Sequence, residues 1–418
     1  MSINTGKGNA TMLTRRTALA GLAAAPLLPR RARARAQAAP AMRIGILQDA
    51  SGTYSYLGGQ GSVACARQAA AEMAGSHGIQ AEFVLADHQN KTDIGLGIAR
   101  QWLEQGVDPL MEFNNSAIAL AVNTLVRDRD RVMLANNVGS AALSGPACTP
   151  NMTHWTFDTA MLARTVGGAL SAQGGQSWFF IRADYVFGKA LRDDTAAVVE
   201  AKGGRVLGEA AVPIGTTDFA SALLQAQSSG ANVVGLALAG GDLLNCLKQA
   251  REFGLAKSGQ KVAALVIYLQ DIHSLGLATA QGTQLAESFY WDLNDRSRAF
   301  TGRVLAATGG KPPNMGQAGA YSAVRHYLRA AAALTPAAAK ASGRAVVERM
   351  KALPIDDDIL TNASIRADGR VVSDAYLFEV KRPEDSRGEW DLYSVTAKLG
   401  PDQAWRPMAD GGCPLART

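Results

Sequence analysis

The most constraining feature of this sequence is a short unit, residues 42–62, whose pattern the chain repeats. It begins with an apolar run, Ile44–Leu47. A run without polar alternation is typical of a strand buried on both faces of a parallel sheet. A polar loop rich in glycine, serine and tyrosine follows, and a helical pattern begins near Val63. Open α/β sheets build ligand sites from loops at the carboxyl ends of their strands. We therefore predict an α/β fold with a ligand site at its strand ends.

Strands and helices alternate along most of the chain. Further apolar runs predict buried strands at 81–86, 108–113, 131–137, 177–182, 205–211, 232–239 and 261–268. A segment rich in proline and glycine, 145–151, interrupts the alternation. Strands separated by helices of about 10–15 residues indicate right-handed βαβ units. We therefore predict two lobes with parallel central sheets.

The last third of the chain is too irregular to form another array of this kind. It contains short elements, among them a strand-like run at 288–291, which indicate a chain that recrosses between the lobes and completes both. Lobe 1 is expected at 42–157 plus 286–355. Lobe 2, which includes the C-terminal tail, is expected at 158–285 plus 356–418.

Charge is distributed unevenly along the chain. Residues 1–38 contain seven of the 42 basic residues and no acidic residue, which leaves 35 basic against 36 acidic residues in the rest. The body is therefore close to neutral, and nothing in it indicates a nucleic acid or an anionic membrane as a partner.

The basic N-terminal segment has the pattern of an export signal. Arg15 and Arg16 lie in a stretch that resembles the twin-arginine signature, and a short apolar region, 18–28, follows. This region is about half as long as a membrane-spanning helix needs to be. Small-x-small sites that end at Ala36 or Ala38 are candidates for cleavage. We predict a twin-arginine-type signal peptide over 1–38 and a mature protein in the periplasm; a disordered basic tail is the alternative.

The four cysteines fall into two pairs by context. Cys65 and Cys246 lie within apolar helical patterns, which favours buried small hydrophobic side chains. Cys148 and Cys413 lie in irregular segments rich in proline and glycine. Since an oxidising compartment favours disulfides, we expect Cys148 and Cys413 to be bonded. No spacing of cysteine and histidine indicates a metal site.

The sequence contains no GxSxG motif and no P-loop, and its five histidines fall on separate elements. One dinucleotide pattern needs weighing: Gly59–Ala64 fits GxGxxA, and Asp87 lies near the end of the second expected strand. About ten residues, two of them tyrosines, separate the first strand from Gly59, where the fingerprint needs a tight turn. We expect no enzymatic activity, no cofactor and no metal. A dinucleotide-dependent enzyme and a regulatory sensor domain are the alternatives.

Polar and aromatic residues recur at strand ends in both arrays. The candidate binding residues at these positions are Tyr54, Tyr56, Asn114, Asn115, Ser116, Gly139, Ser140, Tyr185, Phe187, Asp242 and Asp271. Helix N-termini behind such loops direct backbone N–H groups at a ligand and favour a carboxylate or another anion. Asn115 and Ser116 are equally suited to capping a helix. Because the loops come from both arrays, we predict a shared cleft.

Four segments resemble a known family. They are 43–70, the run NNSAIALAV from Asn114, the run ADYVFG from Ala183, and Leu247–Gly254. Together they resemble type I periplasmic binding proteins, and within these the branched-chain-amino-acid-type substrate-binding proteins of ABC transporters. The resemblance implies two Rossmann-like lobes, joined by three crossovers, that clamp a ligand between them and deliver it to an inner-membrane ABC permease. We expect a monomer.

The resemblance also assigns roles to residues. Asn114–Ser116 and Gly139–Ser140 would hold the carboxylate of the ligand, and Asp271 would hold an ammonium group. Aromatic walls would come from Tyr54 or Tyr56, from Tyr185 or Phe187, and from Tyr290 or Trp291. Two positions depart from the leucine-binding members: Asn114-Asn115 replaces a hydroxyl-rich run, and Ala239–Gly241 lacks aromatic residues.

The charges around the expected cleft indicate the ligand class. No lysine or arginine lies beside the two carboxylate-binding loops, which suits a carboxylate better than a phosphate. Asp242 and Asp271 offer negative charge from the other lobe. This combination predicts a zwitterion, so we expect an amino acid. An aromatic or other organic acid is the alternative, because several tyrosines and Trp291 are expected nearby.

Overall fold

The computed structural model describes residues 41–417, and the expected signal peptide and its cleavage site lie outside them. The first sheet is parallel and has the strand order β2-β1-β3-β4-β5. Its strands are β1 (Met42–Gln48), β2 (Ala81–Asp87), β3 (Leu110–Phe113), β4 (Met133–Asn136) and β5 (Met152–His154). β5 lies after the segment at which the sequence predicted only a break.

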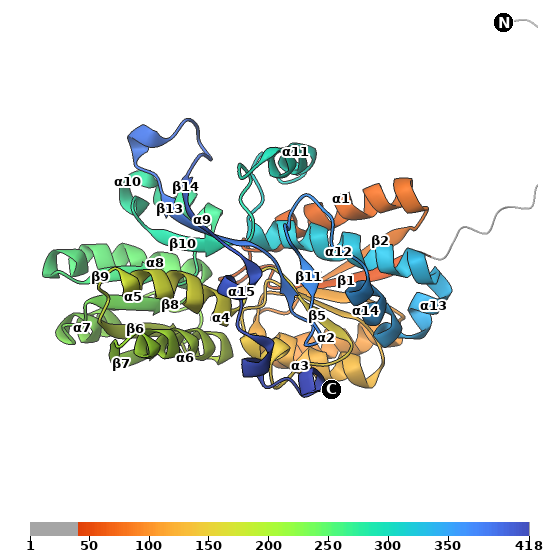
Figure 1. Ribbon diagram of the computed structural model, residues 1–418, viewed down its shortest axis with the longest axis horizontal. Helices are drawn as coiled ribbons and strands as arrows, with labels where there is room; N and C mark the ends of the chain where they lie inside the picture. Colours follow the sequence, from red (N-terminus) through yellow and green to blue (C-terminus); the bar gives the residue numbers. More distant parts are fainter. Residues whose placement is uncertain (1–40, 418) are drawn as a thin grey trace, which may run out of the picture. The chain divides into compact units, whose positions relative to one another are not determined.

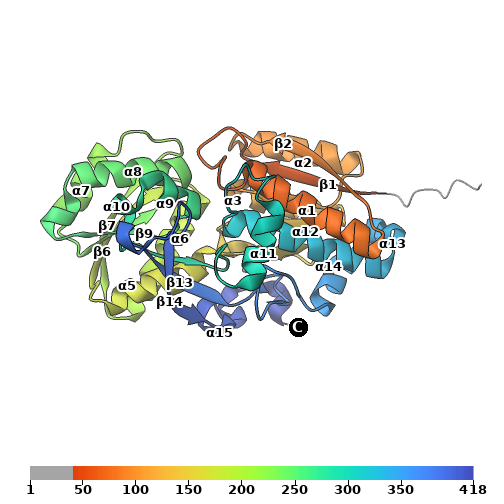
Figure 2. The ribbon, with the colours of Figure 1, turned by 90° about the horizontal axis from the view of Figure 1, so that it is seen from above.

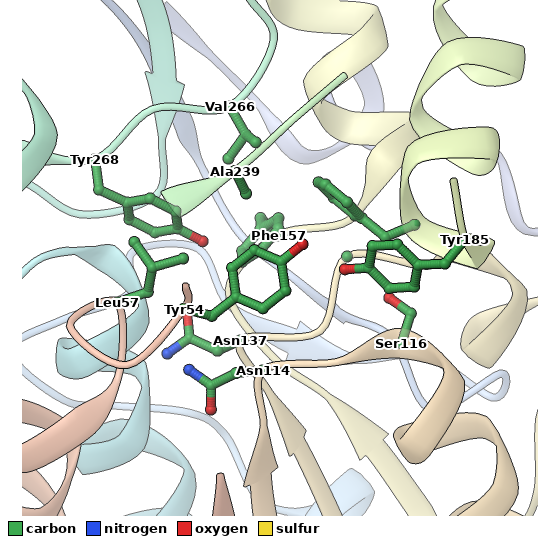
Figure 3. A pocket seen from close by; sticks show the side chains of 12 residues that line it. Tyr54, Leu57, Asn114, Ser116, Asn137, Phe157, Tyr185, Ala239, Val266 and Tyr268 are labelled. Atoms are coloured by element: carbon green, nitrogen blue, oxygen red, sulfur yellow. The ribbon is translucent and has the colours of Figure 1, made fainter. Parts of the chain in front are cut away.

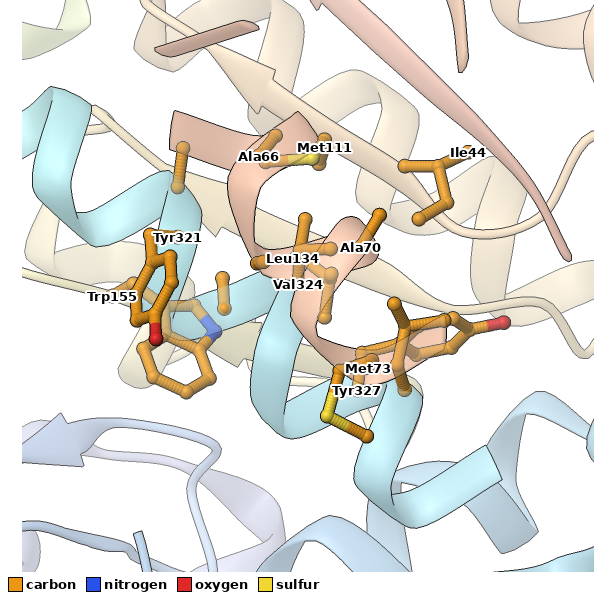
Figure 4. Close-up of a cluster of buried hydrophobic side chains, with 14 of the residues drawn as sticks. Ile44, Ala66, Ala70, Met73, Met111, Leu134, Trp155, Tyr321, Val324 and Tyr327 are labelled. Atoms are coloured by element: carbon orange, nitrogen blue, oxygen red, sulfur yellow. The ribbon is translucent and has the colours of Figure 1, made fainter. Parts of the chain in front are cut away.

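Two pairs of helices cover the two faces of this sheet. α1 (Gly59–His77) and α12 (Met315–Leu334) lie side by side on one face (Figure 4). α2 (Thr92–Glu104) and α3 (Ser116–Asp128) cover the other. In β1, Ile44 and Ile46 pack beneath α1 and α12, whereas Leu47 packs toward α2 and α3. Burial on both faces explains why this strand shows no polar alternation.

The second sheet is also parallel, with the order β7-β6-β8-β9. Its strands are β6 (Ser177–Ala183), β7 (Arg205–Val212), β8 (Val233–Ala237) and β9 (Lys261–Ala264). Its helices are α4 (Thr159–Leu162), α5 (Gly168–Ala172), α6 (Val186–Ala201), α7 (Ala220–Ser228), α8 (Gly240–Glu252), α9 (Leu269–Leu275) and α10 (Leu277–Ala280). Phe179 and Ile181 pack with α7 and α8, and Phe180 packs on the face that α4 and α6 cover. Figure 2 shows the two sheets with their helices as separate groups.

The chain passes between the two parallel sheets three times, after β5, after β10 and after β12 (Figure 1). β10 (Gln284–Glu287), β13 (Ala375–Val380) and β14 (Tyr393–Leu399) form a small antiparallel sheet. The remaining elements are α11 (Asp295–Val304), α13 (Pro336–Ala341), α14 (Gly343–Ala352), β11 (Ser364–Ile365), β12 (Val371–Val372) and α15 (Pro401–Ala404). The predicted fold class is confirmed. The residue boundaries of the two lobes stay a prediction.

Two strand predictions were wrong in ways that bear on the site. β9 ends at Ala264 rather than at 268, because β8, its neighbour, ends at Ala237 and turns into α8. Residues 265–268 are buried all the same, so an apolar pattern cannot separate this loop from a strand. The strand expected at 288–291 lies earlier, as β10, and ends at Glu287.

A disulfide joins the C-terminal tail to the segment before β5. Cys148 and Cys413 are bonded, with Cα atoms 5.7 Å apart and a separation of 265 positions in the sequence. Trp405 reinforces the attachment by donating from Nε1 to the Ser373 carbonyl, 2.7 Å away. Cys65 and Cys246 are free and buried. Across residues 41–417, the longest apolar helices fall short of what a bilayer crossing requires.

Candidate functional site

A cavity lies where loops at the strand ends of both parallel sheets meet (Figure 3). Five aromatic rings and several neutral polar groups surround it. Its lining residues are Tyr54, Leu57, Asn114, Ser116, Asn137, Gly139, Phe157, Tyr185, Phe187, Ala239, Val266 and Tyr268. The sequence placed the site at this edge of the sheets, and the structure has a cavity there.

The loop between β1 and α1 is folded by Asp49. One carboxylate oxygen accepts from the Gly52 N–H at 2.7 Å, and the other accepts from the Tyr54 N–H at 2.9 Å and from Asn90 Nδ2 at 2.6 Å. Asp87 supports the same loop, since it accepts from Ser51 Oγ at 2.6 Å. The GxGxxA run lies inside α1, and residues 49–58 separate it from the end of β1. This arrangement gives the dinucleotide alternative no support.

The last two residues of β3 and the residue after it hold an unusual backbone conformation. Glu112, Phe113 and Asn114 have φ angles of 84°, 88° and 44°. Left-handed backbone at three successive non-glycine residues is strained and is found mainly at functional sites. Both amide atoms of Asn114 are buried and lack a hydrogen-bond partner among the described residues. Because buried polar groups are normally paired, the Asn114 side chain is available to a ligand.

The neighbours of Asn114 mainly serve the protein's own structure. Asn115 caps α3, because its Oδ1 accepts from the N–H groups of Ala117 at 3.0 Å and Ile118 at 3.3 Å. Ser116 Oγ accepts from the Ser140 N–H at 3.1 Å and so joins the two loops expected to bind a carboxylate. Ser116 lines the cavity, whereas Asn115 and Ser140 lie behind its wall.

A carboxylate beneath the cavity orients the asparagines. Glu112 is fully buried and accepts from Ser62 Oγ at 2.8 Å, Asn136 Nδ2 at 2.7 Å and Asn137 Nδ2 at 2.6 Å. Burial raises the pKa of Glu112, and the three donors oppose that shift. Since Asn137 donates to Glu112, its amide is held in one orientation at the cavity wall.

The aromatic wall comes from both halves of the cavity. The rings of Tyr54 and Tyr185 are 6.5 Å apart between centroids, and those of Phe157 and Tyr268 meet edge to face at 6.1 Å. Gly139 is required beside them, because a Cβ atom there would lie 2.5 Å from the Phe187 ring. Burial raises the pKa of all three tyrosines, so their hydroxyl groups stay protonated and can donate.

Three helices begin at the cavity. Ser116 is the first residue of α3, and Tyr185 and Ala239 immediately precede α6 and α8. The N-terminus of a helix carries a partial positive charge and favours anions. No Lys, Arg, His, Asp or Glu is among the lining residues. The cavity therefore combines three helix N-termini with neutral donors, which suits one carboxylate group.

Of the predicted binding residues, the structure brings together Tyr54, Asn114, Ser116, Gly139, Tyr185 and Phe187 as lining residues. Tyr290 and Trp291 lie elsewhere: Tyr290 packs on Phe378 and Tyr393, and Trp291 Nε1 donates to the Trp390 carbonyl. Because β10 ends earlier than the sequence predicted, Tyr290 and Trp291 lie in the crossing after β10 and not at the cavity.

The two aspartates expected to hold an ammonium group already have protein partners. Asp242 accepts from Thr53 Oγ1 and the Gly215 N–H, each at 3.0 Å. Asp271 accepts from the hydroxyl of Tyr56 and, at 2.8 Å, from the Tyr268 N–H. Neither aspartate lines the cavity, and Tyr56 does not either. The ammonium role stays a prediction, to which this geometry lends no support.

Sequence reasoning missed Leu57, Asn137, Phe157, Ala239, Val266 and Tyr268 as lining residues. Two of them could have been found, because Asn137 shares a loop with Gly139, and Ala239 directly precedes the Gly240 that was considered. Val266 and Tyr268 were hidden by the strand prediction that extended four residues too far. Leu57 and Phe157 carry no signal that separates them from ordinary core residues.

Asp271→Asn is expected to change how stability depends on pH. Burial raises the pKa of Asp271 from 3.8 to about 6. The folded state therefore favours the protonated Asp271 side chain. Its stabilising effect is complete below about pH 4 and is lost as the pH rises through about 6, where the buried carboxyl group ionises. Asparagine stays neutral throughout. Relative to wild type, the free energy of unfolding of the variant should rise by roughly 2–3 kcal/mol between pH 4 and 8.

Urea denaturation at a series of pH values measures this difference. Asp93→Asn, which removes a solvent-exposed carboxylate, is the control and should follow the wild-type profile. A constant difference between Asp271→Asn and wild type across the range would contradict the prediction.

Comparison with known proteins gives a consistent picture. A family model described as periplasmic binding protein matches residues 41–388. A periplasmic binding protein from Burkholderia mallei is 41% identical, with 90% of this chain and 99% of that chain covered and a TM-score of 0.85. A branched chain amino acid ABC transporter periplasmic ligand-binding protein from Burkholderia xenovorans LB400 is 36% identical, with 90% and 99% covered and a TM-score of 0.77.

A more distant likeness concerns the fold alone. A solute binding protein of an ABC transporter from R. palustris, in complex with benzoate, is 19% identical, with 87% of this chain and 97% of that chain covered and a TM-score of 0.76. No curated protein sequence is significantly similar to this chain.

Proposed function

Because the chain belongs to the periplasmic binding protein family, we propose that it captures a small aromatic carboxylate in this cavity and delivers it to an ABC permease. The family comprises solute-binding receptors rather than enzymes. We further propose that the protein is exported through a twin-arginine-type signal, acts as a monomer and has no enzymatic activity. N-terminal sequencing of exported protein that still showed Met1 would overturn the proposed signal.

The observation that carries the ligand class is the composition of the cavity wall. Its polar groups are neutral, three helix N-termini meet at it, and five aromatic rings enclose it. Helix N-termini and amide or hydroxyl donors can bind a carboxylate without the help of a basic residue. The five aromatic rings can make stacked and edge-to-face contacts with an aromatic ring of the ligand. A buried ammonium group would need a partner of opposite charge, and the lining offers none.

An α-amino acid is the second candidate. The 36% identical protein from Burkholderia xenovorans LB400 carries a branched chain amino acid name, and Asp242 and Asp271 lie in the first turns of α8 and α9. Both carboxylates already accept two hydrogen bonds from the protein, however. Binding an ammonium group would require them to give up these donors.

Calorimetric titration of the mature protein, freed of bound ligand by unfolding and refolding, separates the two candidates. We expect benzoate to bind at least about tenfold more tightly than L-phenylalanine, a difference of about 1.4 kcal/mol, because the amino acid brings an unpaired ammonium group. Cyclohexanecarboxylate, which keeps the carboxylate but lacks the aromatic ring, is the control and should bind less tightly than benzoate. Tighter binding of L-phenylalanine or L-leucine than of benzoate would overturn the aromatic-acid proposal in favour of the amino acid.

A further inference from the structure

Thr53, in the loop between β1 and α1, caps a helix of the other sheet. Its carbonyl accepts from the Gly241 N–H at 3.1 Å, and its Oγ1 accepts from the Asp242 N–H at 3.2 Å. The same hydroxyl donates to Asp242 Oδ1 at 3.0 Å. Helix α8 has no side-chain cap of its own, because Ala239 occupies its N-cap position. The N-terminal N–H groups of α8 therefore find partners in a residue that is 188 positions earlier than Gly241 in the chain.

Tyr56 makes a parallel connection to α9. Its hydroxyl donates to Asp271, whose other oxygen accepts from the Tyr268 N–H at 2.8 Å. Asp271 is fully buried, and it forms no ion pair within residues 41–417. The connection therefore holds the loop against α9 and also fixes the backbone of Tyr268, which lines the cavity.

The two connections flank the cavity residues of the loop. Tyr54 lies between Thr53 and Tyr56, and Leu57 follows directly. On the side of the first sheet, the loop is held by Asn314, the N-cap residue of α12, whose Nδ2 donates to the Leu57 carbonyl at 3.0 Å. A loop anchored on both sides places Tyr54 and Leu57 over the cavity.

Two glycines at the start of α8 leave room for Thr53 to pack against the helix. A Cβ atom at Gly240 would lie 2.3 Å from the Thr53 carbonyl oxygen, and one at Gly241 would lie 2.9 Å from Thr53 Oγ1. Gly240 also has a φ of +62°, which favours glycine for its own sake, whereas Gly241 has no such requirement. The Gly240-Gly241 pair, which departs from the leucine-binding pattern, thus has a structural reason in this chain.

We propose that Thr53 and Tyr56 form a latch on α8 and α9, with Asp242 and Asp271 as positioning residues that hold the cavity shut without touching the ligand. The latch rests on the proposed function as a solute receptor but not on the ligand being aromatic. In this proposal, Asp242 and Asp271 keep the cavity closed and do not contact the ligand. A latch should lower the dissociation rate of any ligand by the same factor, whereas a contact to an ammonium group would act on amino acids alone.

Gly241→Ala is the sharpest test, because alanine is favourable within α8 and meets only Thr53. We expect the Kd to rise at least about tenfold, mainly through faster dissociation in stopped-flow measurements. Thermal unfolding of the ligand-free protein should stay as in wild type. Gly97→Ala, in α2, is the matched control, since a Cβ atom there meets no atom within 4 Å.

Side-chain variants test the hydroxyl groups themselves. Thr53→Val and Tyr56→Phe remove one hydroxyl each, and both should raise the Kd about three- to tenfold, as expected for hydrogen bonds to buried carboxylates. Thr53→Ser keeps the hydroxyl and should restore wild-type affinity. The increase in Kd is measured with benzoate and with L-leucine, using whichever of the two binds to the wild-type protein.

The outcomes separate the latch from the ligand proposal. If an amino acid binds and benzoate does not, the aromatic-acid proposal fails. The latch would still be supported if the variants raised the Kd of that amino acid by the expected factors. Wild-type Kd and dissociation rate in Gly241→Ala and in Thr53→Val would overturn the latch, whichever ligand binds. A loss confined to L-leucine in Asp271→Asn would also overturn it and return Asp271 to the ammonium role.

Discussion

Asn114→Asp is expected to abolish measurable binding of a carboxylate ligand while leaving the fold intact. The two side chains have the same shape, and aspartate tolerates the left-handed φ of 44° at this position about as well as asparagine. The new carboxylate would occupy a buried position that has no partner among the described residues. Two like charges about 4 Å apart repel by roughly 4 kcal/mol at an effective dielectric constant of about 20, which corresponds to about a thousandfold loss of affinity.

Asn115→Asp is the matched control for this experiment. It adds the same charge one residue away, outside the lining, at an N-cap position where aspartate serves as well as asparagine. Calorimetry with benzoate should show a much smaller loss for this variant. A Kd within about tenfold of wild type for Asn114→Asp would contradict carboxylate binding at Asn114. Tighter binding of L-phenylalanine by Asn114→Asp would place an ammonium group there instead.

Arg370→Ala is expected to lower the free energy of unfolding by roughly 3–5 kcal/mol, because it leaves a buried carboxylate without its cation. Arg370 is fully buried, and its Nε lies 3.5 Å from Asp158 Oδ2. Its Nη1 donates to the Phe157 carbonyl at 3.0 Å, and its guanidinium lies 4.1 Å from the centre of the Trp405 ring. Burial lowers the pKa of Arg370 to about 10, so the group stays charged at neutral pH.

This cluster joins three separate parts of the chain. Arg370 lies beside β12, Phe157 lies in the first crossing and lines the cavity, and Trp405 lies in the disulfide-bonded tail. Denaturant unfolding measures the loss, and Arg370→Lys, which keeps the charge but not the planar stacking, should lie between alanine and wild type. Arg382→Ala, at an exposed site, is the control and should unfold as wild type does. A loss below about 1 kcal/mol for Arg370→Ala would contradict the role of the cluster.

The sequence placed much of the site because the signals were local. Asn114, Ser116, Gly139 and Tyr185 lie shortly after the ends of buried strands, and in a parallel sheet the carboxyl ends of strands share one edge. The same rule could not choose which side chain of a loop faces the ligand. Asn115 and Asn114 are chemically identical neighbours, yet one caps α3 and the other is left unpaired in the cavity wall.

The assignment of Asp271 shows how a boundary error propagates. Residues 265–268 are apolar and buried whether they form a strand or a loop, so hydrophobic pattern alone extended β9 by four residues. The expected binding loop therefore moved past Val266 and Tyr268 to Asp271, which in fact lies in the first turn of α9. Strand length is decided by the neighbouring strand, and β8 ends before those residues.

By itself, the sequence determined the alternating strands and helices, the two parallel sheets, the edge at which the site lies and the cysteines suited to a disulfide. Each of these depends on residues close together in the chain or on their apolar period. Only the tertiary structure decided that Thr53 caps α8, that Tyr56 meets Asp271, and that Arg370 joins Phe157 to Trp405. Hydrogen bonds and ion pairs between distant residues depend on where the packed sheets bring them, and nothing in the local pattern encodes which donor a buried carboxylate will meet.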